Sequence, residues 1–314
     1  MTAGDIKKTV VIPAYKVADS IKDVVCSVPT SVDHIIVVDD KCPQNSGKIA
    51  DDLGNPKVIV IYHEKNQGVG AAVVSGYKKA MELGSDIVIK MDGDGQMDPR
   101  YLDELIEPLT RNKADYTKGN RFMDFAALRT MPKLRLIGNN ILSFMEKSFS
   151  GYWNIMDPTN GYTAIHKRVL TELNLEKIAK RYFFESDMLL NLYLANAVIK
   201  DVPIPTKYGD EESSLSVWQA LIKFPPRLLY GILKRIFLRY FIYDFNMASV
   251  YILLGVPMFL WGVLFGAVEW YDSYANNIPK TAGTIMLAAL PLIISFEMLL
   301  QAINIDIHNV PRKK

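Results

Sequence analysis

Oxygen-bearing side chains follow an apolar run in the first third of the chain. The run at residues 87–91 reads IVIKM, and Asp92, Asp94 and Gln96 come directly after it. Two carboxylates separated by one small residue can hold a hard divalent cation, Mg²⁺ or Mn²⁺, that prefers oxygen ligands and leaves positions for phosphate. Gly93 between them lets the backbone approach a ligand closely. The spacing therefore predicts cation-assisted chemistry on a phosphate or diphosphate at the tip of a strand.

Two other candidate motifs, one at Asp92 and one at residues 68–73, do not fit their consensus patterns. A calcium loop beginning at Asp92 would need glycine at its sixth position and glutamate at its twelfth, where the chain has Met97 and Asp103. The glycines at residues 68–73, GVGAAV, resemble a dinucleotide-binding loop, but they follow the third apolar run instead of the first, and the final glycine is absent. A helix N-terminus near an anion remains compatible with that segment.

The elements that must position these residues alternate between short apolar runs and helical stretches. Four runs, at 10–12, 35–38, 58–62 and 87–91, predict strands of a mostly parallel sheet with helices on both faces. Ligands of such sheets bind beyond the carboxyl ends of the strands. The residues at those ends are Pro13, Ala14 and Tyr15 after the first run, Asp39 and Asp40 after the second, and Asp92 to Gln96 after the fourth. We expect them to converge on one crevice.

The C-terminal third has a different composition. Residues 247–268 contain no charged side chain, and residues 281–305 contain Glu297 as their only charged one. Each run reaches the ~20 apolar residues needed to cross a bilayer. The interior Pro291 and Glu297 make the second run the weaker candidate for a membrane span. A neighbouring helix that pairs with these residues would make both tolerable in a bilayer. We therefore expect a two-helix transmembrane hairpin.

The charges that flank these runs predict an orientation. Lysines and arginines gather before the first run, between residues 223 and 239, and after the second, at Arg312 to Lys314. The connecting stretch carries Glu269 and Asp272. Positive charge marks the cytoplasmic side, so we expect the N-terminal portion and the C-terminus in the cytosol. The first apolar run begins at residue 10, so we expect no signal peptide before it.

A segment between the two parts interleaves aromatic residues with cations. Residues 216–245 are typical of amphipathic helices in a lipid interface, and Pro225-Pro226 predicts a break between two pieces. We thus expect a catalytic domain at 1–214, interfacial helices at 215–245 and the transmembrane hairpin with a basic tail at 246–314. The formal net charge of +2 gives no indication of nucleic-acid binding.

These motifs together resemble the inverting family 2 glycosyltransferases with the GT-A fold, a Rossmann-like α/β fold. The resemblance is strongest to the polyprenyl-phosphate sugar synthases, the dolichyl-phosphate mannose or glucose synthase group. It rests on the stretches VVIPAYKVADSI, IIVVDDKCPQNS, NQGVGAAVVSGYKKA and MDGDGQMDP. Lys16-Val17 stand where the family has Asn-Glu, Lys41-Cys42 where it has Gly-Ser, and Gly93 where it has Ala.

The resemblance implies donor and metal roles for particular residues. Asp94 and Gln96 would ligate Mg²⁺ or Mn²⁺, and Asp92 would position the ribose and the diphosphate of a nucleotide sugar. The implied donor-binding set is Pro13, Ala14, Tyr15, Asp39, Asp40, Gly68, Asp92, Gly93 and Lys207. Lys207 would substitute for an Arg and a Ser-Lys pair that the family carries in a closing loop and that this chain lacks.

The resemblance also implies an acceptor side. Arg121 and Arg135 are similar to arginines that hold a lipid phosphate, Arg121 counting among the catalytic residues with Asp92 and Asp94. Asp157 and Gly161 would shape the acceptor site. The implied function is transfer of one sugar from a UDP- or GDP-hexose to dolichyl or undecaprenyl phosphate at a lipid bilayer, and a homo-oligomer is left open.

Three other functions are compatible with parts of this pattern. A transferase of a cell-surface polysaccharide pathway would use a sugar hydroxyl as acceptor and a base such as Glu185 or Asp187. A processive polysaccharide synthase would carry a Gln-x-x-Arg-Trp motif and more spans, which this chain does not have. A non-catalytic scaffold is disfavoured by the intact Asp-x-Asp pair.

Overall fold

The computed structural model describes residues 6–121, 133–158, 160–181, 183–204 and 217–313, without the side chains of residues 133–140, 142 and 217–225. The chain forms two compact units. The first comprises Met1–Gly231 with Pro311–Lys314, and the second comprises Ile232–Val310.

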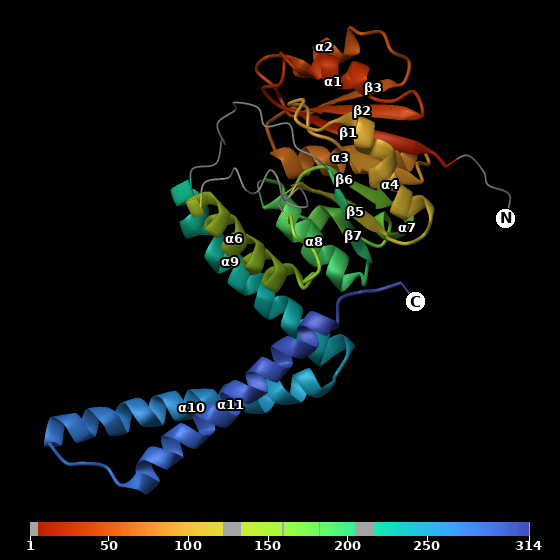
Figure 1. Ribbon diagram of the computed structural model, residues 1–314. Coiled ribbons are helices and arrows are strands. Elements are labelled where there is room, and N and C mark those ends of the chain that lie inside the picture. Colours follow the sequence, from red (N-terminus) through yellow and green to blue (C-terminus); the bar gives the residue numbers. More distant parts are fainter. Residues whose placement is uncertain (1–5, 122–132, 159, 182, 205–216, 314) are drawn as a thin grey trace. The chain divides into compact units, whose positions relative to one another are not determined.

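The first unit alternates strands and helices (Figure 1). Its strands are β1 (Lys8–Ala14), β2 (His34–Asp39), β3 (Val58–Tyr62), β4 (Ile87–Lys90), β5 (Tyr116–Asn120), β6 (Thr163–His166) and β7 (Ile199–Pro203). Its helices are α1 (Ile21–Ser27), α2 (Ser46–Asp51), α3 (Val69–Glu82), α4 (Leu102–Thr110), α6 (Lys133–Ser150), α7 (Lys167–Leu170) and α8 (Phe184–Leu194), with 3₁₀ turns η1 (Pro99–Tyr101) and η3 (Leu175–Lys177).

The seven strands form one sheet in the order β3-β2-β1-β4-β6-β5-β7. β6 runs antiparallel to its neighbours β4 and β5, and the other pairings are parallel. The mostly parallel sheet predicted from the sequence is confirmed, and the four apolar runs are β1 to β4. The carboxyl ends of β1, β2 and β4 therefore open on the same edge of the sheet.

Helices cover both faces of the sheet because side chains alternate along each strand. Val10 and Ile12 of β1 pack with α1 and α4, whereas Val11 points the other way, towards α3. All three side chains are fully buried. Strands buried on both faces are apolar throughout, and for that reason the four runs are recognisable without alternation.

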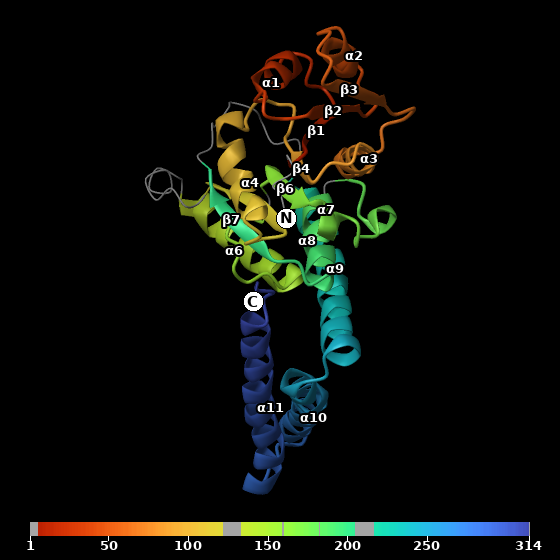
Figure 2. The ribbon, with the colours of Figure 1, turned by 90° about the vertical axis from the view of Figure 1, so that its right-hand side faces the viewer.

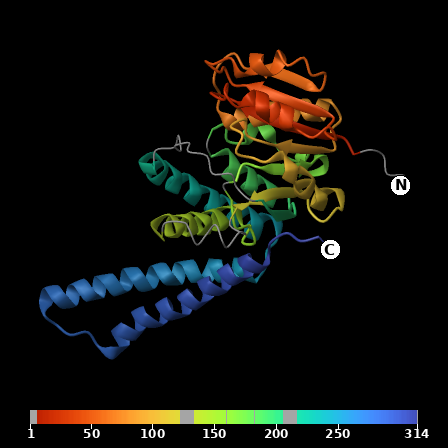
Figure 3. The ribbon, with the colours of Figure 1, turned by 45° about the horizontal axis from the view of Figure 1, so that its top comes forward.

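The second unit holds two long helices, α10 (Met247–Asn276) and α11 (Ala282–His308). Asn246 caps the N-terminus of α10. Its side-chain oxygen accepts from the backbone amide of Ala248 at 2.9 Å, and its backbone amide donates to Ser249 Oγ. Both helices are long and apolar enough to cross a membrane. Figures 2 and 3 show them side by side, joined at one end by residues 277–281.

The two long helices pack closely against each other, and a buried ion pair joins α11 to α9 (Val217–Phe237). Gly262 of α10 leaves no room for a side chain, since a Cβ there would lie 2.7 Å from Cγ of Leu292. At the end of α11, the carboxylate of Asp306 accepts from Arg235 at 2.6 and 2.9 Å and from the Tyr240 hydroxyl at 2.7 Å. Asp306 is thereby tied to the segment that precedes α10.

One sequence-based expectation about the segment before the hairpin is wrong. Pro225-Pro226 does not split it, because α9 (Val217–Phe237) runs through both prolines. The fixed φ of proline is compatible with a helix, and the loss of hydrogen bonds is local. The helix changes instead at Leu238–Tyr243, where a π-helical turn, η4, precedes α10.

Candidate active site

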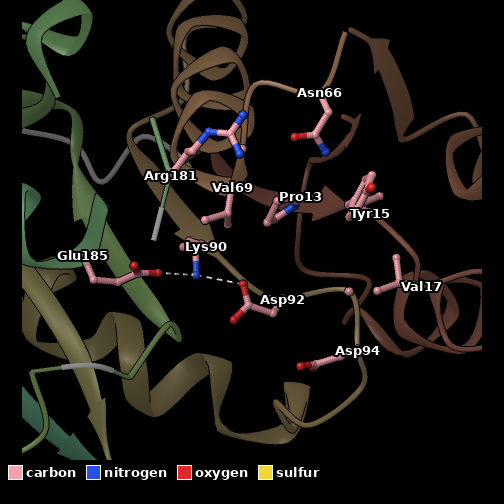
Figure 4. A pocket seen from close by; sticks show the side chains of 13 residues that line it. Pro13, Tyr15, Val17, Asn66, Val69, Lys90, Asp92, Asp94, Arg181 and Glu185 are labelled. Carbon is pink, nitrogen blue, oxygen red and sulfur yellow. Dashed lines mark hydrogen bonds and ion pairs between the residues drawn. The ribbon is translucent and has the colours of Figure 1, made fainter. Parts of the chain in front are cut away.

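A pocket of about 570 Å³ opens at the carboxyl ends of β1 and β4, whereas the residues after β2, which were expected in the same crevice, do not line it. It is bounded by the ends of β1 and β4, the start of α3 and the residues that lead into α8 (Figure 4). Its lining residues are Pro13, Ala14, Tyr15, Val17, Asn66, Gly68, Val69, Lys90, Asp92, Gly93, Asp94, Arg181 and Glu185. The fold thus brings together side chains from four separate parts of the chain.

Lys90 lies at the centre of the pocket wall and was not predicted. Its Nζ donates to Asp92 Oδ1 at 2.8 Å and lies 3.3 Å from Glu185 Oε1 (Figure 4). The side chain is only 2% exposed. Burial alone would lower the pKa of Lys90, but the carboxylates of Asp92 and Glu185 outweigh burial and hold that pKa above its ordinary value. Lys90 is therefore a fixed cation between two carboxylates.

A signal for Lys90 was present in the sequence. It is a lysine inside an apolar strand, and residues i and i+2 of a strand face the same side. Lys90 and Asp92 therefore point to the same face of the sheet. A buried lysine needs a charged partner, and the nearest acidic residue along the chain is Asp92.

Asp92 and Asp94 both line the pocket, whereas the predicted metal ligand Gln96 is not among its lining residues. Asp94 Oδ1 accepts from the backbone N–H of Gln96 at 2.9 Å, and this hydrogen bond shapes the turn after β4. Within the described residues, no three His, Cys, Asp or Glu side chains are grouped to hold a metal. Two carboxylates nevertheless fit Mg²⁺ or Mn²⁺, since such cations are commonly bound by one or two carboxylates and the phosphates of a substrate.

The two aspartates after β2 lie behind the pocket wall. Asp39 is 4% exposed and accepts from the amides of Cys42 and Gly47 at 2.6 and 2.7 Å. Asp40 is 2% exposed and accepts from His63 Nδ1 and from the Gly68 amide, both at 2.7 Å. Their predicted contact with a donor stays a prediction, while their visible task is to fix the loops around the pocket.

Gly68 connects Asp40 to the pocket. Its φ of +98° lies in the region that favours glycine, and a Cβ would lie 2.6 Å from the carbonyl oxygen of Lys180. With Gly68 fixed in this way, the first turn of α3 reaches the pocket at Val69. The Ala71 amide of that turn donates to the Lys180 carbonyl at 3.1 Å, and the dipole of the 14-residue helix favours an anion at its N-terminus.

The predicted acceptor residues Arg121 and Asp157 form a pair. Arg121 Nε and Nη2 donate to the two oxygens of Asp157 at 2.7 and 3.0 Å. The Asp157 side chain is fully buried and that of Arg121 is 33% exposed. This two-pronged geometry is the strongest form of such a contact. Neither residue lines the pocket.

Gly161, the other predicted acceptor residue, lies directly against Lys90 and Asp92 of the pocket wall. Its carbonyl oxygen accepts from Lys90 Nζ at 3.2 Å. A Cβ at this position would lie 2.5 Å from Asp92 Oδ2 and 2.6 Å from Lys90 Nζ, so a larger residue would displace the ion pair between them. The segment that contains Asp157 and Gly161 is thereby joined to the Asp-x-Asp turn. Lys207 and the side chain of Arg135 lie outside the described residues.

The two candidate bases are separated by the structure. Glu185 lines the pocket, but Asp187 does not, and Asp187 Oδ2 instead accepts from the Ala179 amide at 2.8 Å. Arg181 also lines the pocket and was not predicted. It lies in the stretch that leads to Glu185, and only the meeting of this stretch with α3 brings its charge to the pocket.

The fold is shared with a sugar-transferring enzyme of known structure. Glucosyl-3-phosphoglycerate synthase from Mycobacterium tuberculosis, solved with Mn²⁺, UDP-glucose and phosphoglyceric acid, superposes with a TM-score of 0.53. The identity is 19%, and the match covers 73% of this chain and 79% of that chain. The chain therefore has the GT-A fold.

Sequence comparison identifies the family within that fold. The model of "Glycosyl transferase family 2" matches residues 9–173. The UDP-N-acetylglucosamine–dolichyl-phosphate N-acetylglucosaminyltransferase of Methanococcus voltae is 36% identical over 215 residues, covering 64% of this chain and 85% of that protein. Polyprenol monophosphomannose synthase of Mycolicibacterium smegmatis is 29% identical over 201 residues, covering 62% and 75%. The chain belongs to glycosyl transferase family 2 and is a glycosyltransferase.

Proposed function

We propose that this glycosyltransferase moves one sugar from a nucleotide sugar to the phosphate of a polyprenyl phosphate. The observation that carries the proposal is the pocket in which Asp92 and Asp94 lie near the N-terminus of α3. Carboxylates that share a cation with phosphate oxygens, and a helix N-terminus that attracts an anion, together suit a nucleoside diphosphate. The acceptor is supported by the two relatives, which are named for dolichyl phosphate and for polyprenol monophosphomannose.

The reaction we propose is an in-line displacement with inversion. An oxygen of the acceptor phosphate attacks the anomeric carbon, the bond from that carbon to the diphosphate oxygen breaks, and the nucleoside diphosphate leaves with the electron pair. The attacking oxygen is already anionic at neutral pH, so no general base is required. Positioning of the two reactants then supplies most of the acceleration.

Residues of the pocket have distinct tasks in this proposal. Asp92 and Asp94 would hold Mg²⁺ or Mn²⁺, which when bound neutralises charge on the departing diphosphate. Lys90 keeps Asp92 in place, and Arg181 adds positive charge on the opposite wall. Arg121, Arg135, Asp157 and Gly161 are proposed to form the acceptor side, and Lys207 and Gln96 keep their predicted donor and metal roles.

Membrane attachment is part of the proposal. A polyprenyl chain stays in the bilayer, so an enzyme that uses its phosphate gains from being anchored there. α10 and α11 have the length and composition for that anchor. Exposed apolar side chains on α9 and η4, among them Tyr230, Phe237 and Tyr243, suit a lipid interface. The distribution of Lys and Arg supports a cytosolic location of the catalytic domain.

The test is a transfer assay with the purified full-length protein in lipid nanodiscs. Radiolabelled UDP-N-acetylglucosamine, UDP-glucose and GDP-mannose are offered in turn, each with a polyprenyl phosphate and, as the matched control, with the corresponding polyprenol. We expect label in the lipid product with one donor, only when the phosphate is present and only with Mg²⁺ or Mn²⁺. Equal transfer to the polyprenol, or no transfer from any nucleotide sugar to the phosphate, contradicts the proposal.

A second candidate is transfer to a sugar hydroxyl, which the location of Glu185 in the pocket favours. A hydroxyl needs a base, and removing a general base typically costs 10²–10⁴-fold in rate. Glu185→Gln separates the two candidates because it preserves shape and removes the charge. If the acceptor is a phosphate, we expect kcat of Glu185→Gln to fall by roughly tenfold or less. A fall in kcat of roughly 10²–10⁴-fold would favour a hydroxyl acceptor.

A further inference from the structure

Four polar side chains form a line along α11. They are Glu297, Gln301, Asn304 and His308, and all four are exposed. Their separations of four, three and four residues place them on one face of a helix. We call this line the polar stripe. It is unusual because the rest of α11 between Ala282 and Ile303 carries no charged residue.

The polar stripe faces away from α10. The buried residues of α11 are Ser295, Ala302 and Asp306, and Glu297 lies roughly 160° around the helix from Ser295 at 100° per residue. The face towards α10 is already filled by close contacts, such as that of Gly255 with Leu299. α10 therefore does not supply partners for the stripe.

Glu297 lies deep in the apolar part of the helix. α11 has 27 residues, so its middle residue is Ser295, and Glu297 is two residues beyond it. At 1.5 Å per residue, Glu297 is about 3 Å from the middle of the helix. If α11 spans a bilayer, as proposed above, this carboxyl group faces the hydrocarbon near its centre, where polar groups are costly unless paired.

The helix itself gives Glu297 one partner. Gln301 Nε2 donates to Glu297 Oε1 at 2.9 Å. Neither side chain bonds to another helix in the part of the chain that the structure describes. Lipid tails offer no hydrogen bonds, so the remaining donor and acceptor atoms of the pair need a protein partner.

We propose that the polar stripe is the contact through which two copies of this chain associate in the membrane. A carboxyl group and an amide are complementary to each other, and a two-fold axis along the membrane normal brings Glu297 and Gln301 of one copy beside the same two residues of the other, so that each carboxyl group can accept from the amide of the other copy. The hydrogen-bonding atoms of Glu297 and Gln301 then have partners in both copies. Ile293 and Leu290, exposed on the same face, pack around them. The proposal rests on the membrane-spanning role of α11 and is independent of the reaction.

Cysteine cross-linking in native membranes tests this contact. Ile293→Cys lies beside the stripe, and Leu264→Cys is the matched control on α10. Both positions are well exposed, at 66% and 64%, and Leu264 lies near the depth of Leu292 because Gly262 contacts that residue. Each is made in full-length protein with Cys26→Ser, which removes the exposed native thiol. We expect an oxidant to give a disulfide-linked dimer with Ile293→Cys and much less with Leu264→Cys.

The second experiment removes the polar atoms and keeps the helix apolar. Glu297→Leu with Gln301→Leu favours insertion, so loss of the fold is not a concern. We expect the dimer dissociation constant in detergent to rise by roughly three- to tenfold, the range of hydrogen bonds between membrane helices. An unchanged constant, equal cross-linking at both positions, or cross-links of Ile293→Cys to a different protein overturns the proposal. Asp94→Ala should dimerise normally, so failure of the proposed function remains distinguishable.

Discussion

The ammonium of Lys90 lies 2.8 Å from Oδ1 of Asp92, so a cation from the same strand holds the first carboxylate of the Asp-x-Asp pair. The same ammonium donates to the carbonyl of Gly161 and lies near Glu185. Three segments that are distant in sequence are therefore organised around one buried charge. A divalent cation bound to Asp92 would lie near the Lys90 ammonium. Because Lys90 already holds Oδ1 of Asp92, the carboxylate has little freedom to rotate towards that cation.

The first prediction concerns Lys90 itself. Lys90→Met keeps the length of the side chain but leaves Asp92 and Glu185 without their cation. Breaking a buried ion pair from one side costs about 3–5 kcal/mol, so we expect a clear fall in Tm and a loss of transfer activity. Adding Glu185→Gln to the variant should restore part of the Tm, because one uncompensated charge is gone, without restoring activity. Thermal unfolding and kcat measure the two effects, and a wild-type Tm for the single variant would contradict the reading.

The second prediction is metal dependence. Asp94→Ala should reduce transfer by roughly 100-fold or more, the order lost when a group that stabilises charge in the transition state is removed. The fold should persist, because Asp94 lies on the turn after β4 and not in the core. Asp103→Ala, at an exposed carboxylate of α4, is the matched control and should be near wild type. Full activity in EDTA would show that no divalent cation is needed.

The third prediction separates the acceptor from the donor. Arg121→Lys removes the fork that meets Asp157 at 2.7 and 3.0 Å, and lysine cannot replace it. We expect the KM for polyprenyl phosphate to rise by roughly tenfold, corresponding to about 1.4 kcal/mol, with little change for the nucleotide sugar. Arg111→Lys, at an arginine whose side chain is 62% exposed, is the control. A lower Tm with an unchanged acceptor KM would restrict Arg121 to a structural role.

The fourth prediction concerns topology. Lys and Arg precede the N-terminus of α10 and follow the C-terminus of α11. The loop that joins the two helices should therefore face away from the cytosol. Asn276→Cys should react with a membrane-impermeant thiol reagent in intact cells, and Arg312→Cys should not. Arg312 is preferable to Lys313 because it is exposed, whereas Lys313 pairs with Asp115 at 2.9 Å. Both variants need Cys26→Ser, and reversed labelling would invert the proposed orientation.

The sequence by itself determined the local elements and the type of chemistry. β1 to β4 were readable because strands buried on both faces must be continuously apolar. The Asp-x-Asp pair was readable because its meaning depends on a spacing of two residues at a strand end. α10 and α11 were readable because membrane-spanning length is a local property. Strands β5 to β7 carry Lys118, Asn120, His166 and Lys200, and this mixed composition hid them.

Only the tertiary structure decided which residues share the pocket. Lys90 and Gly161 are 71 residues apart, and Lys90 and Glu185 are 95 apart, so no local pattern records their contacts. The same holds for the pairing of Arg121 with Asp157, and for the burial of Asp39 and Asp40 behind the wall that they support. Residue type sets what a side chain can do, but the packing of distant segments sets its partners, and these partners decide whether a charge meets a ligand or another residue of the chain.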